Sequence, residues 1–211
     1  MPAVASRTTL MLATAHLARH DQRLATVIGD VGSATITPHR AYYQALVESI
    51  ISQQLSVKAA ATILQRFLGL FPADSFPLPT AILALGDEQL RSVGLSRQKA
   101  SYIKDLAHKV ISGTVVFDNL DVLSNDAIIA ELTTIKGVGV WTVHMFLLFC
   151  MGRLDVLPTG DLGIKNGIQK LYQLDVAPTP SQIEQLAQDN QWHPYESVAS
   201  WYIWKSLDNK A

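Results

Sequence analysis

The sequence predicts an all-α fold, and three observations support this prediction. Apolar residues recur at helical spacing along nearly the whole chain of 211 residues, and connectors rich in glycine or proline separate the apolar runs. Strand-like alternation is scarce, and its best example, residues 114–117, is too short to define a sheet. The chain is 48% hydrophobic and 17% charged, which is typical of a globular protein. This length suffices for one well-packed domain or for two intimate lobes that share a core.

The first half of the chain predicts a series of short helices. Residues 10–28 fit a helix pair interrupted near His20 and Asp21, and residues 39–52 carry apolar side chains at helical spacing after a loop. Ser56 has the character of an N-cap for a helix that ends at Phe67 or Leu68. Residues 71–79 hold three prolines and are expected to form a connector.

The second half continues this pattern. Three helices are expected at residues 80–85, 87–93 and 96–112, and residues 124–134 lead into a glycine turn that is followed by a helix at 140–150. Helices at 162–172, 181–188 and 195–207 complete the chain. The sequence shows no internal repeat and no low-complexity tract.

Composition excludes several classes of protein. No apolar run reaches the roughly 18 residues that a transmembrane helix needs, and we expect the N-terminus to belong to the domain and not to a signal peptide. The single cysteine, Cys150, excludes an internal disulfide, a cysteine-rich zinc site and a four-cysteine iron–sulfur cluster. We expect Cys150 to be a buried core thiol, and a cytoplasmic location, associated with the nucleoid if the source is bacterial, is the default.

The net charge argues against a nucleic-acid-binding protein. At −1, with an isoelectric point of about 6.6, the chain lacks the basic character that is usual in DNA-binding domains. A DNA-binding surface on this chain must therefore be small and local.

Gly137 and Gly139 lie one residue apart between two expected helices. A glycine accepts positive φ and allows another backbone to come close, and the first amides of the following helix carry the positive end of its dipole. A phosphate suits such a turn. An ordinary helix end explains the same two glycines, because this spacing alone is a weak signal.

Asp161 follows Pro158, Thr159 and Gly160 and precedes a helix. Aspartate at this position is usually a helix cap. A carboxylate near a sugar C1′ is also able to stabilise developing positive charge or to polarise a water, as in glycoside hydrolysis. The aspartate alone does not decide between the two interpretations.

These motifs together resemble the helix–hairpin–helix (HhH-GPD) DNA glycosylase superfamily, in particular its 3-methyladenine DNA glycosylase II type. The hairpin corresponds to residues 135–142, the segment with the catalytic aspartate to 157–165, the wedge segment to 50–60, a second turn to 93–100 and the first helices to 16–25. The resemblance covers nearly the whole chain. It implies a two-lobed helical fold with the active-site cleft between the lobes, a single domain over residues 1–211 with the helix–hairpin–helix at about 132–150, and no additional N-terminal sheet domain.

The resemblance also implies roles for individual residues. Asp161 falls on the catalytic position, whereas Trp141, Trp204 and Met145 fall on positions of the base pocket. Gln54 falls on the wedge position, where the best-known relative has leucine. Core packing is the alternative for both tryptophans, and it is the better explanation of Trp192 and Trp201. The residues expected to contact DNA are Lys136, Gly137, Val138, Gly139, Thr142, Gln53, Gln54, Ser56, Lys58, Gly94, Arg97 and Lys99.

One position indicates the type of reaction. Superfamily members that also cut the DNA backbone carry a lysine two residues after the second hairpin glycine, and this lysine forms a Schiff base with the sugar. Trp141 occupies that position here. The resemblance therefore implies a monofunctional glycosylase without lyase activity. It implies no cofactor and no catalytic metal, and it leaves room for a structural monovalent cation at the hairpin carbonyls.

The sequence thus predicts an enzyme of base excision repair that hydrolyses the N-glycosidic bond of alkylated purines in double-stranded DNA. The expected substrate is 3-methyladenine, with 7-methylguanine as a further candidate, and the expected state is a monomer. Met145 and Gly160 depart from the best-known relative, so a glycosylase for deaminated or etheno bases remains an alternative. A non-catalytic helix–hairpin–helix module and a helical protein-interaction domain are the other two.

Overall fold

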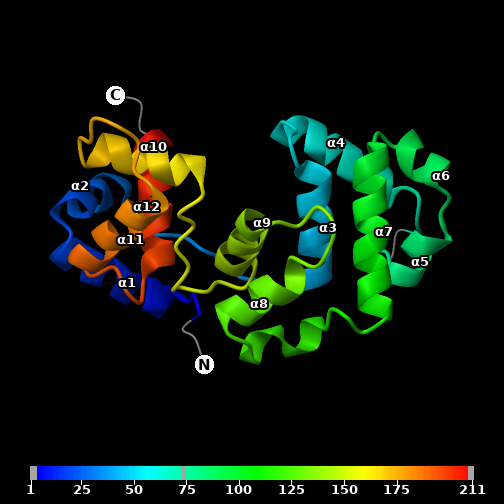
Figure 1. The fold of residues 1–211 in the computed structure, drawn as a ribbon, viewed down its shortest axis with the longest axis horizontal. Helices are drawn as coiled ribbons and strands as arrows, with labels where there is room; N and C mark the ends of the chain where they lie inside the picture. Colours follow the sequence, from blue (N-terminus) through cyan, green and yellow to red (C-terminus); the bar gives the residue numbers. More distant parts are fainter. Residues whose placement is uncertain (1–3, 73–74, 209–211) are drawn as a thin grey trace. The chain divides into compact units, whose positions relative to one another are not determined.

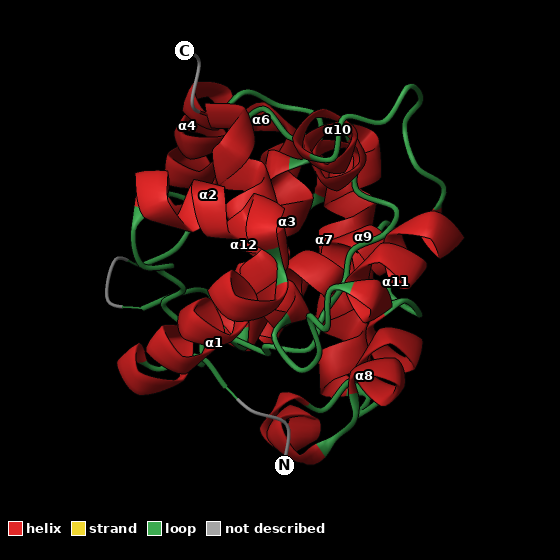
Figure 2. Ribbon diagram, turned by 90° about the vertical axis from the view of Figure 1, so that its left-hand side faces the viewer, coloured by secondary structure: helices red, strands yellow, loops and turns green. Residues whose placement is uncertain are grey.

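The computed structural model describes residues 4–72 and 75–208. All regular elements in these two ranges are helices, as Figure 2 shows, and the one β-like feature among them is an isolated bridge between Val4 and Arg153. The all-α prediction is confirmed. Contacts between Cα atoms divide the chain into two compact units, Met1–Arg40 with His144–Ala211 and Ala41–Val143. In the described part of the chain no helix is long and apolar enough to cross a membrane.

The first unit contains the chain's two ends (Figure 1). Its elements are α1 (Arg7–His20), α2 (Gln22–Val31), the π-helix η2 (Phe146–Cys150), α10 (Leu162–Leu171), α11 (Pro180–Asp189) and α12 (Glu196–Asp208). Helix α12 packs against α10, α2 and α1. Trp192 and Trp201 belong to the apolar core of this unit, as predicted, and Cys150 is buried.

Asp21 explains why the first expected helix is interrupted. Its Oδ1 accepts hydrogen bonds from the amides of Arg23 and Leu24, each at 2.9 Å, and so caps α2. Its Oδ2 accepts from Trp192 Nε1 at 2.8 Å and from the hydroxyl of Tyr172. Burial, and then the hydrogen bond to Asp21, raise the pKa of Tyr172, so the phenol remains a donor. A buried carboxylate thus ties α2 to the C-terminal helices.

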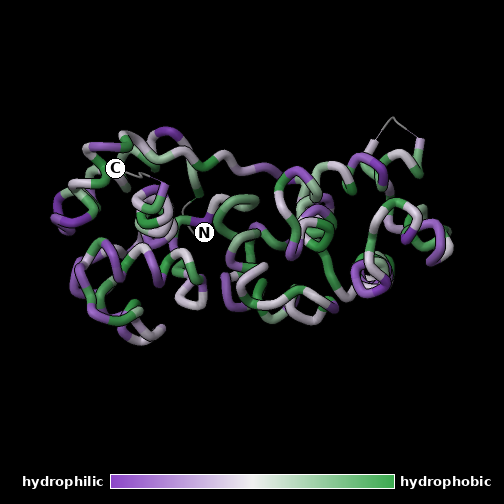
Figure 3. The backbone as a smooth tube through the Cα atoms, turned by 90° about the horizontal axis from the view of Figure 1, so that it is seen from above, coloured by the Kyte–Doolittle hydropathy of each residue, from purple (hydrophilic) through white to green (hydrophobic). Residues whose placement is uncertain are grey.

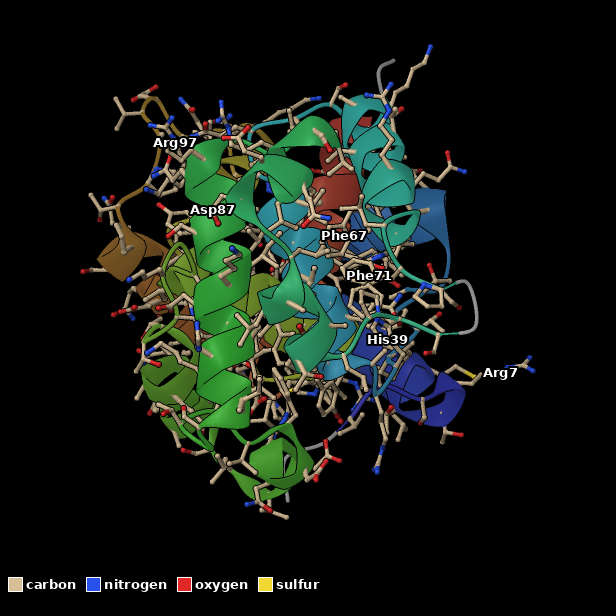
Figure 4. All side chains as sticks on the ribbon, turned by 90° about the vertical axis from the view of Figure 1, so that its right-hand side faces the viewer. Arg7, His39, Phe67, Phe71, Asp87 and Arg97 are labelled. Atoms are coloured by element: carbon tan, nitrogen blue, oxygen red, sulfur yellow. The ribbon has the colours of Figure 1, made fainter. Side chains whose placement is uncertain are left out.

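The second unit consists of α3 (Tyr42–Ser52), α4 (Val57–Leu68), α5 (Pro79–Ala84), α6 (Asp87–Ser92), α7 (Arg97–Ile111), the 3₁₀-helix η1 (Phe117–Val122), α8 (Asn125–Leu132) and the first turn of α9 (Val140–Met145). Helix α7 contacts α3, α5 and α6, and Figure 1 shows it between α3 and the other two. Phe67 and Phe71 lie side by side with ring centroids 5.3 Å apart (Figure 4).

Several of the helices, such as α2 and α4, are amphipathic. Figure 3 shows hydrophobic and hydrophilic residues following one another along the helical turns. Side-chain caps fix several of their starts, and Ser56, predicted as an N-cap, accepts the amide of Ala59 at 3.3 Å at the head of α4. The predicted helix at 140–150 is present but changes from α to π geometry at Phe146.

Residues 114–117, the best strand candidate in the sequence, form no strand, in agreement with the expectation that this run is too short to define a sheet. The amides of Thr114 and Val115 both donate to the carbonyl of Lys109, at 2.9 and 3.1 Å, which folds these residues back on the end of α7. The amide of Val116 donates to Glu131 Oε1 at 2.9 Å. These backbone donors are therefore used by Lys109 and Glu131 and not by a neighbouring strand, and the chain continues into the 3₁₀-helix η1.

Candidate active site and hairpin

Asp161 is the N-cap of α10 in the first unit. A turn that brings its amide to the carbonyl of Pro158, at 2.9 Å, places the residue at the head of the helix. Its Oδ1 accepts the amide of Ile164 at 2.8 Å, and the side chain is buried, with 9% of the residue exposed. The local structure therefore fits the capping interpretation. Capping does not exclude catalysis, because a cap also fixes the orientation of the carboxylate.

Trp204 reaches the same carboxylate from α12. Its Nε1 donates to Asp161 Oδ1 at 2.9 Å, so one oxygen atom accepts both the indole and the helix amide. The indole in turn stacks against Phe149, with ring centroids 5.6 Å apart and planes tilted by 31°. Aromatic surface and an oriented carboxylate are thus held together by two packed helices and η2.

Two glycines of α10 make this arrangement sterically feasible. A Cβ on Gly163 would lie 2.9 Å from Trp204 Nε1 and 3.0 Å from Asp161 Oδ1, and one on Gly167 would lie 2.4 Å from Ile203 Cγ2. Sequence reasoning did not single out Gly163, Gly167 or Phe149. The four-residue spacing of the glycines within a helix is the signal that could have identified the close approach of α12.

We expect Trp204→Phe to lower base release roughly 10- to 100-fold, because a hydrogen bond to a charged group contributes about 1.5–3 kcal/mol. The ring remains but the donor to Asp161 is lost. Single-turnover release of methylated bases measures the effect. The matched control is Trp192→Phe, which removes an indole donor to the other buried aspartate, Asp21. The Trp192→Phe control should lower the free energy of unfolding and leave single-turnover release by the folded protein unchanged. Equal losses of base release in the two variants would refute a specific role for the hydrogen bond from Trp204 to Asp161.

The remaining residues predicted for the base pocket differ in exposure. Trp141, in the second unit, is 50% exposed, whereas Met145 is partly buried in the first. Burial lowers the pKa of the neighbouring His144, which favours its neutral form. The role of Trp141 and Met145 in a base pocket stays a prediction.

The glycine turn lies in the second unit between α8 and α9. Gly137 has φ of +79°, and a Cβ there would lie 2.0 Å from the ring of Tyr102 on α7. The amide of Val138 donates to the carbonyl of Ile135 at 3.1 Å, and the Gly139 carbonyl accepts the amide of Val143 at 3.1 Å at the start of α9. Gly139 has open space around it and no left-handed φ. The structure therefore requires a glycine at position 137 but not at position 139.

The polar residues of the hairpin are partly engaged within the protein. The amide of Lys136 donates to Asp105 Oδ2 at 2.9 Å, and its ammonium lies 3.6 Å from Oδ1 of the same residue. Val138 and Thr142 are buried, with 4% and 6% exposed. The carboxylate of Asp105 thus lies beside Lys136, which the sequence did not indicate. The most distinctive feature of the glycine turn is therefore its backbone.

The expected wedge segment forms a tight turn after α3. Gln53 has φ of −48° and ψ of 129°, Gln54 has φ of +57°, and the amide of Leu55 donates to the carbonyl of Ser52 at 3.1 Å. This is the geometry of a type II turn, whose third position favours glycine. Gln54 is exposed in this strained conformation, and Lys58 is exposed in the next helix. The strained conformation is consistent with the predicted wedge role but does not establish it, since Gln173 has the same φ.

Replacement of Gln54 by glycine separates strain from function. We expect Gln54→Gly to raise the free energy of unfolding by about 0.5–1 kcal/mol, because glycine accepts positive φ without strain. Base release should fall roughly 10-fold, about 1.4 kcal/mol, if the amide fills the space of the displaced base. Gln173 also has φ of +57°. Gln173→Gly should therefore stabilise equally without slowing release, and unchanged release by Gln54→Gly would refute the wedge role.

The second predicted turn precedes α7. Gly94 has φ of +102°, and Ser96 caps the helix by accepting the amide of Lys99 at 3.1 Å. Arg97 is exposed at the first turn of α7, where Figure 4 shows it near Asp87. The side chain of Lys99 is directed into the protein instead and donates to backbone carbonyls of α3 and the following turn.

Neither part of the chain shows a metal site in the residues that the structure describes, since no group of three or more histidine, cysteine or acidic side chains is suitably placed. The hairpin carbonyls of Ile135, Gly137 and Gly139 already accept hydrogen bonds, the middle one from Gln53 Nε2 at 2.8 Å. A monovalent cation at the hairpin therefore stays a prediction, and the proposed function does not depend on one.

The fold agrees with comparisons to known proteins. The family model described as "HhH-GPD superfamily base excision DNA repair protein" matches residues 47–191, and the chain belongs to this family. A relative from Schizosaccharomyces pombe, DNA-3-methyladenine glycosylase 1, is 35% identical over 203 residues, which cover 94% of this chain and 88% of the relative.

Solved structures give the same result. The S. pombe 3-methyladenine DNA glycosylase Mag1, solved in complex with abasic DNA, superposes with a TM-score of 0.78 at 35% identity, over 92% of this chain and 95% of that one. The DNA-3-methyladenine glycosidase of Bacillus halodurans has a TM-score of 0.83 at 34% identity, over 93% and 89% of the two chains. The predicted family and helical fold are confirmed.

Proposed function

We propose that this protein is a monofunctional DNA glycosylase that hydrolyses the N-glycosidic bond of alkylated purines in double-stranded DNA and leaves an abasic site. The substrate that we expect first is 3-methyladenine, followed by 7-methylguanine. The observation that carries the proposal is the oriented carboxylate of Asp161, which accepts hydrogen bonds from the amide of Ile164 and from Trp204 Nε1. The names of the relatives from S. pombe and B. halodurans support the substrate class.

Asp161 is the catalytic residue of the proposal. Departure of the base leaves positive charge on the sugar at C1′, and a fixed carboxylate stabilises that charge or orients the attacking water. An alkylated purine is already cationic and leaves as a neutral base, so no strong general acid is required. A carboxylate held by two donors needs little reorganisation as positive charge develops at C1′. Its catalytic contribution comes from this preorganisation.

Trp141, Trp204 and Met145 are proposed to form the base pocket. An electron-rich indole attracts a cationic ring through its face, which favours an alkylated base over a normal one. The base must first leave the helical stack, at a cost of a few kcal/mol, and damaged or weakly paired bases leave most readily. Selection thus combines ease of flipping with the affinity of the pocket for positive charge.

Trp141 also defines the reaction type that we propose. Lyase activity requires an amine that forms a Schiff base with the sugar. Indole nitrogen is not a nucleophile of this kind. We therefore propose that water is the acceptor and that the DNA backbone remains intact after the base has left.

DNA contact is proposed at three segments of the second unit. The hairpin, residues 135–142, offers backbone amides to a phosphate, and the turn at 53–56 with Lys58 carries the wedge. The turn at Gly94 and the exposed Arg97 provide the third contact. The S. pombe relative was solved with abasic DNA, which supports DNA as the partner. We further propose a single domain and a monomer that acts in the cytoplasm, at the nucleoid if the source is bacterial.

Base release from three DNA substrates tests the proposal. Purified protein is incubated with randomly methylated DNA, with deaminated DNA and with DNA that contains ethenoadenine, and released bases are identified by chromatography. We expect 3-methyladenine from the first substrate and abasic sites without strand cleavage. Release only from the other two would establish a glycosylase for different lesions, and binding without any release would establish a non-catalytic module.

A further inference from the structure

Lys99 directs its side chain into the second unit. Its ammonium donates to the carbonyl of Ile51 at 2.8 Å and to that of Gln53 at 2.6 Å. Two of its three N–H donors are therefore occupied within the protein. Burial lowers the pKa of this lysine, as expected for a side chain partly withdrawn from water.

The two acceptors are the carbonyl of Ile51, the next-to-last residue of α3, and that of Gln53, which precedes Gln54 in the turn. The carbonyl between them, that of Ser52, accepts the amide of Leu55 at 3.1 Å. Three consecutive carbonyls at the end of α3 are thus satisfied, and the cation lies at the negative end of the helix dipole. Lys99 fixes the residue before the strained Gln54, and so determines where the exposed tip of the turn is held.

The same helix also supports the hairpin. Tyr102, one turn after Lys99, packs its ring on Gly137, and Asp105, a further turn along, accepts the amide of Lys136 at 2.9 Å. Gln53 closes the arrangement, because its side chain donates to the Gly137 carbonyl at 2.8 Å. The turn and the hairpin are therefore joined to each other and to one face of α7.

We propose that Lys99 is a positioning residue that holds the Gln54 turn in register with the hairpin, so that both engage the same DNA as one element. Its cation serves the protein's own carbonyls and not a phosphate. The proposal rests on the proposed function for its consequence in DNA, whereas the tether itself belongs to the free protein. It also changes the expectation for Gln53, whose amide is an internal link to the hairpin.

Amide hydrogen exchange without DNA tests the tether first. Lys99→Met should speed exchange at Leu55 roughly 10-fold relative to wild type, because the turn loses its anchor. The control Arg97→Met removes an exposed cation from the same helix and should leave exchange at Leu55 unchanged. Equal protection of Leu55 in Lys99→Met and wild type would overturn the proposal. This result does not depend on whether the protein is a glycosylase.

Salt-dependent binding and base flipping then separate positioning from phosphate contact. The ligand for binding is a duplex with a tetrahydrofuran abasic analogue, and a second duplex with 2-aminopurine at the target position reports flipping through its fluorescence. We expect Lys99→Met to reduce flipping roughly 10- to 100-fold, as small misplacements do, with the slope of log K against log salt unchanged. Arg97→Met should reduce that slope by about 0.9. A slope reduced by Lys99→Met with normal flipping would overturn the proposal.

Two further variants exclude a general loss of folding. Lys99→Arg keeps a cation that can donate to both carbonyls and should restore most of the flipping. Gln53→Ala cuts the link to Gly137, and its effect on flipping should not add to that of Lys99→Met, because both variants uncouple the same element. Full additivity would contradict a single element. Wild-type protein that neither flips nor releases a base would refute the proposed function and leave the exchange result standing.

Discussion

Asp161→Asn is expected to abolish base release while DNA binding persists. Asparagine is as good an N-cap as aspartate, and its amide oxygen can accept both the Ile164 amide and Trp204 Nε1, so α10 should remain in place. The negative charge is lost, and with it the stabilisation of the sugar cation. We expect release to fall roughly 1,000-fold or more, about 4 kcal/mol in transition-state stabilisation. Single-turnover chromatography of released 3-methyladenine measures it.

The chain contains a matched control for this variant. Asp21 is also a buried N-cap aspartate that accepts an indole N–H, from Trp192. Asp21→Asn should lower the free energy of unfolding, since its Oδ2 accepts from two donors that an amide group cannot satisfy, and should leave release by the folded protein near wild type. Release of 3-methyladenine by Asp161→Asn at more than a tenth of the wild-type rate would contradict the catalytic role.

Local signals predicted most of the fold. Ser56 has a short polar side chain ahead of an amphipathic run, and Asp21 interrupts another; the structure makes each an N-cap. The absence of a strand at residues 114–117 has a non-local component. Their β-branched side chains favour a strand, but Glu131, from α8, captures the Val116 amide. A partner 15 residues away is invisible to periodicity.

In the candidate site, too, local sequence signals predict some features, whereas contacts between distant residues determine others. Asp161 could be predicted because a short motif surrounds it. Its bond to Trp204 could not, because that contact joins residues 43 positions apart on two helices and depends on Gly163 having no side chain. Lys99 shows the opposite limit: a lysine beside a turn suggests a phosphate contact, but its ammonium donates to the carbonyls of Ile51 in α3 and of Gln53 in the following turn. The residue type alone does not determine the direction in which a side chain points.

The low net charge fits this distribution of cations. Lys104 pairs with Asp87, whose pKa is held low chiefly by the hydrogen bond from that lysine, and Lys136 lies beside Asp105. Several basic side chains thus serve neighbouring carboxylates or carbonyls. Phosphate binding would then depend on a few exposed cations and on hairpin amides, which require a backbone of fixed shape. The shape of that backbone depends on Gly137.

Gly137→Ala is expected to disrupt the hairpin, whereas Gly139→Ala is not. A methyl group on Gly137 would lie 2.0 Å from the ring of Tyr102 and would require φ of +79° in an alanine. The left-handed conformation costs about 1–2 kcal/mol and overpacking a further 1–3 kcal/mol, so unfolding should become easier by roughly 2–5 kcal/mol. Gly139 meets nothing within 4 Å, and its alanine variant should change stability by about 0.5 kcal/mol or less. Urea denaturation measures both.

The cause can be assigned with Tyr102→Ala. This change removes the ring that the new methyl group would meet, so the double variant with Gly137→Ala should recover the steric part of the loss but not the part due to φ. A coupling energy of about 1–3 kcal/mol is therefore expected, and purely additive losses would show that the clash relaxes at no cost.

Gly139→Ala makes the complementary test. If it binds abasic-analogue DNA normally, no phosphate comes close to that Cα. A binding loss of 10-fold or more in a fully stable variant would instead locate the phosphate at Gly139, because in the free protein nothing else occupies the space its methyl group would fill.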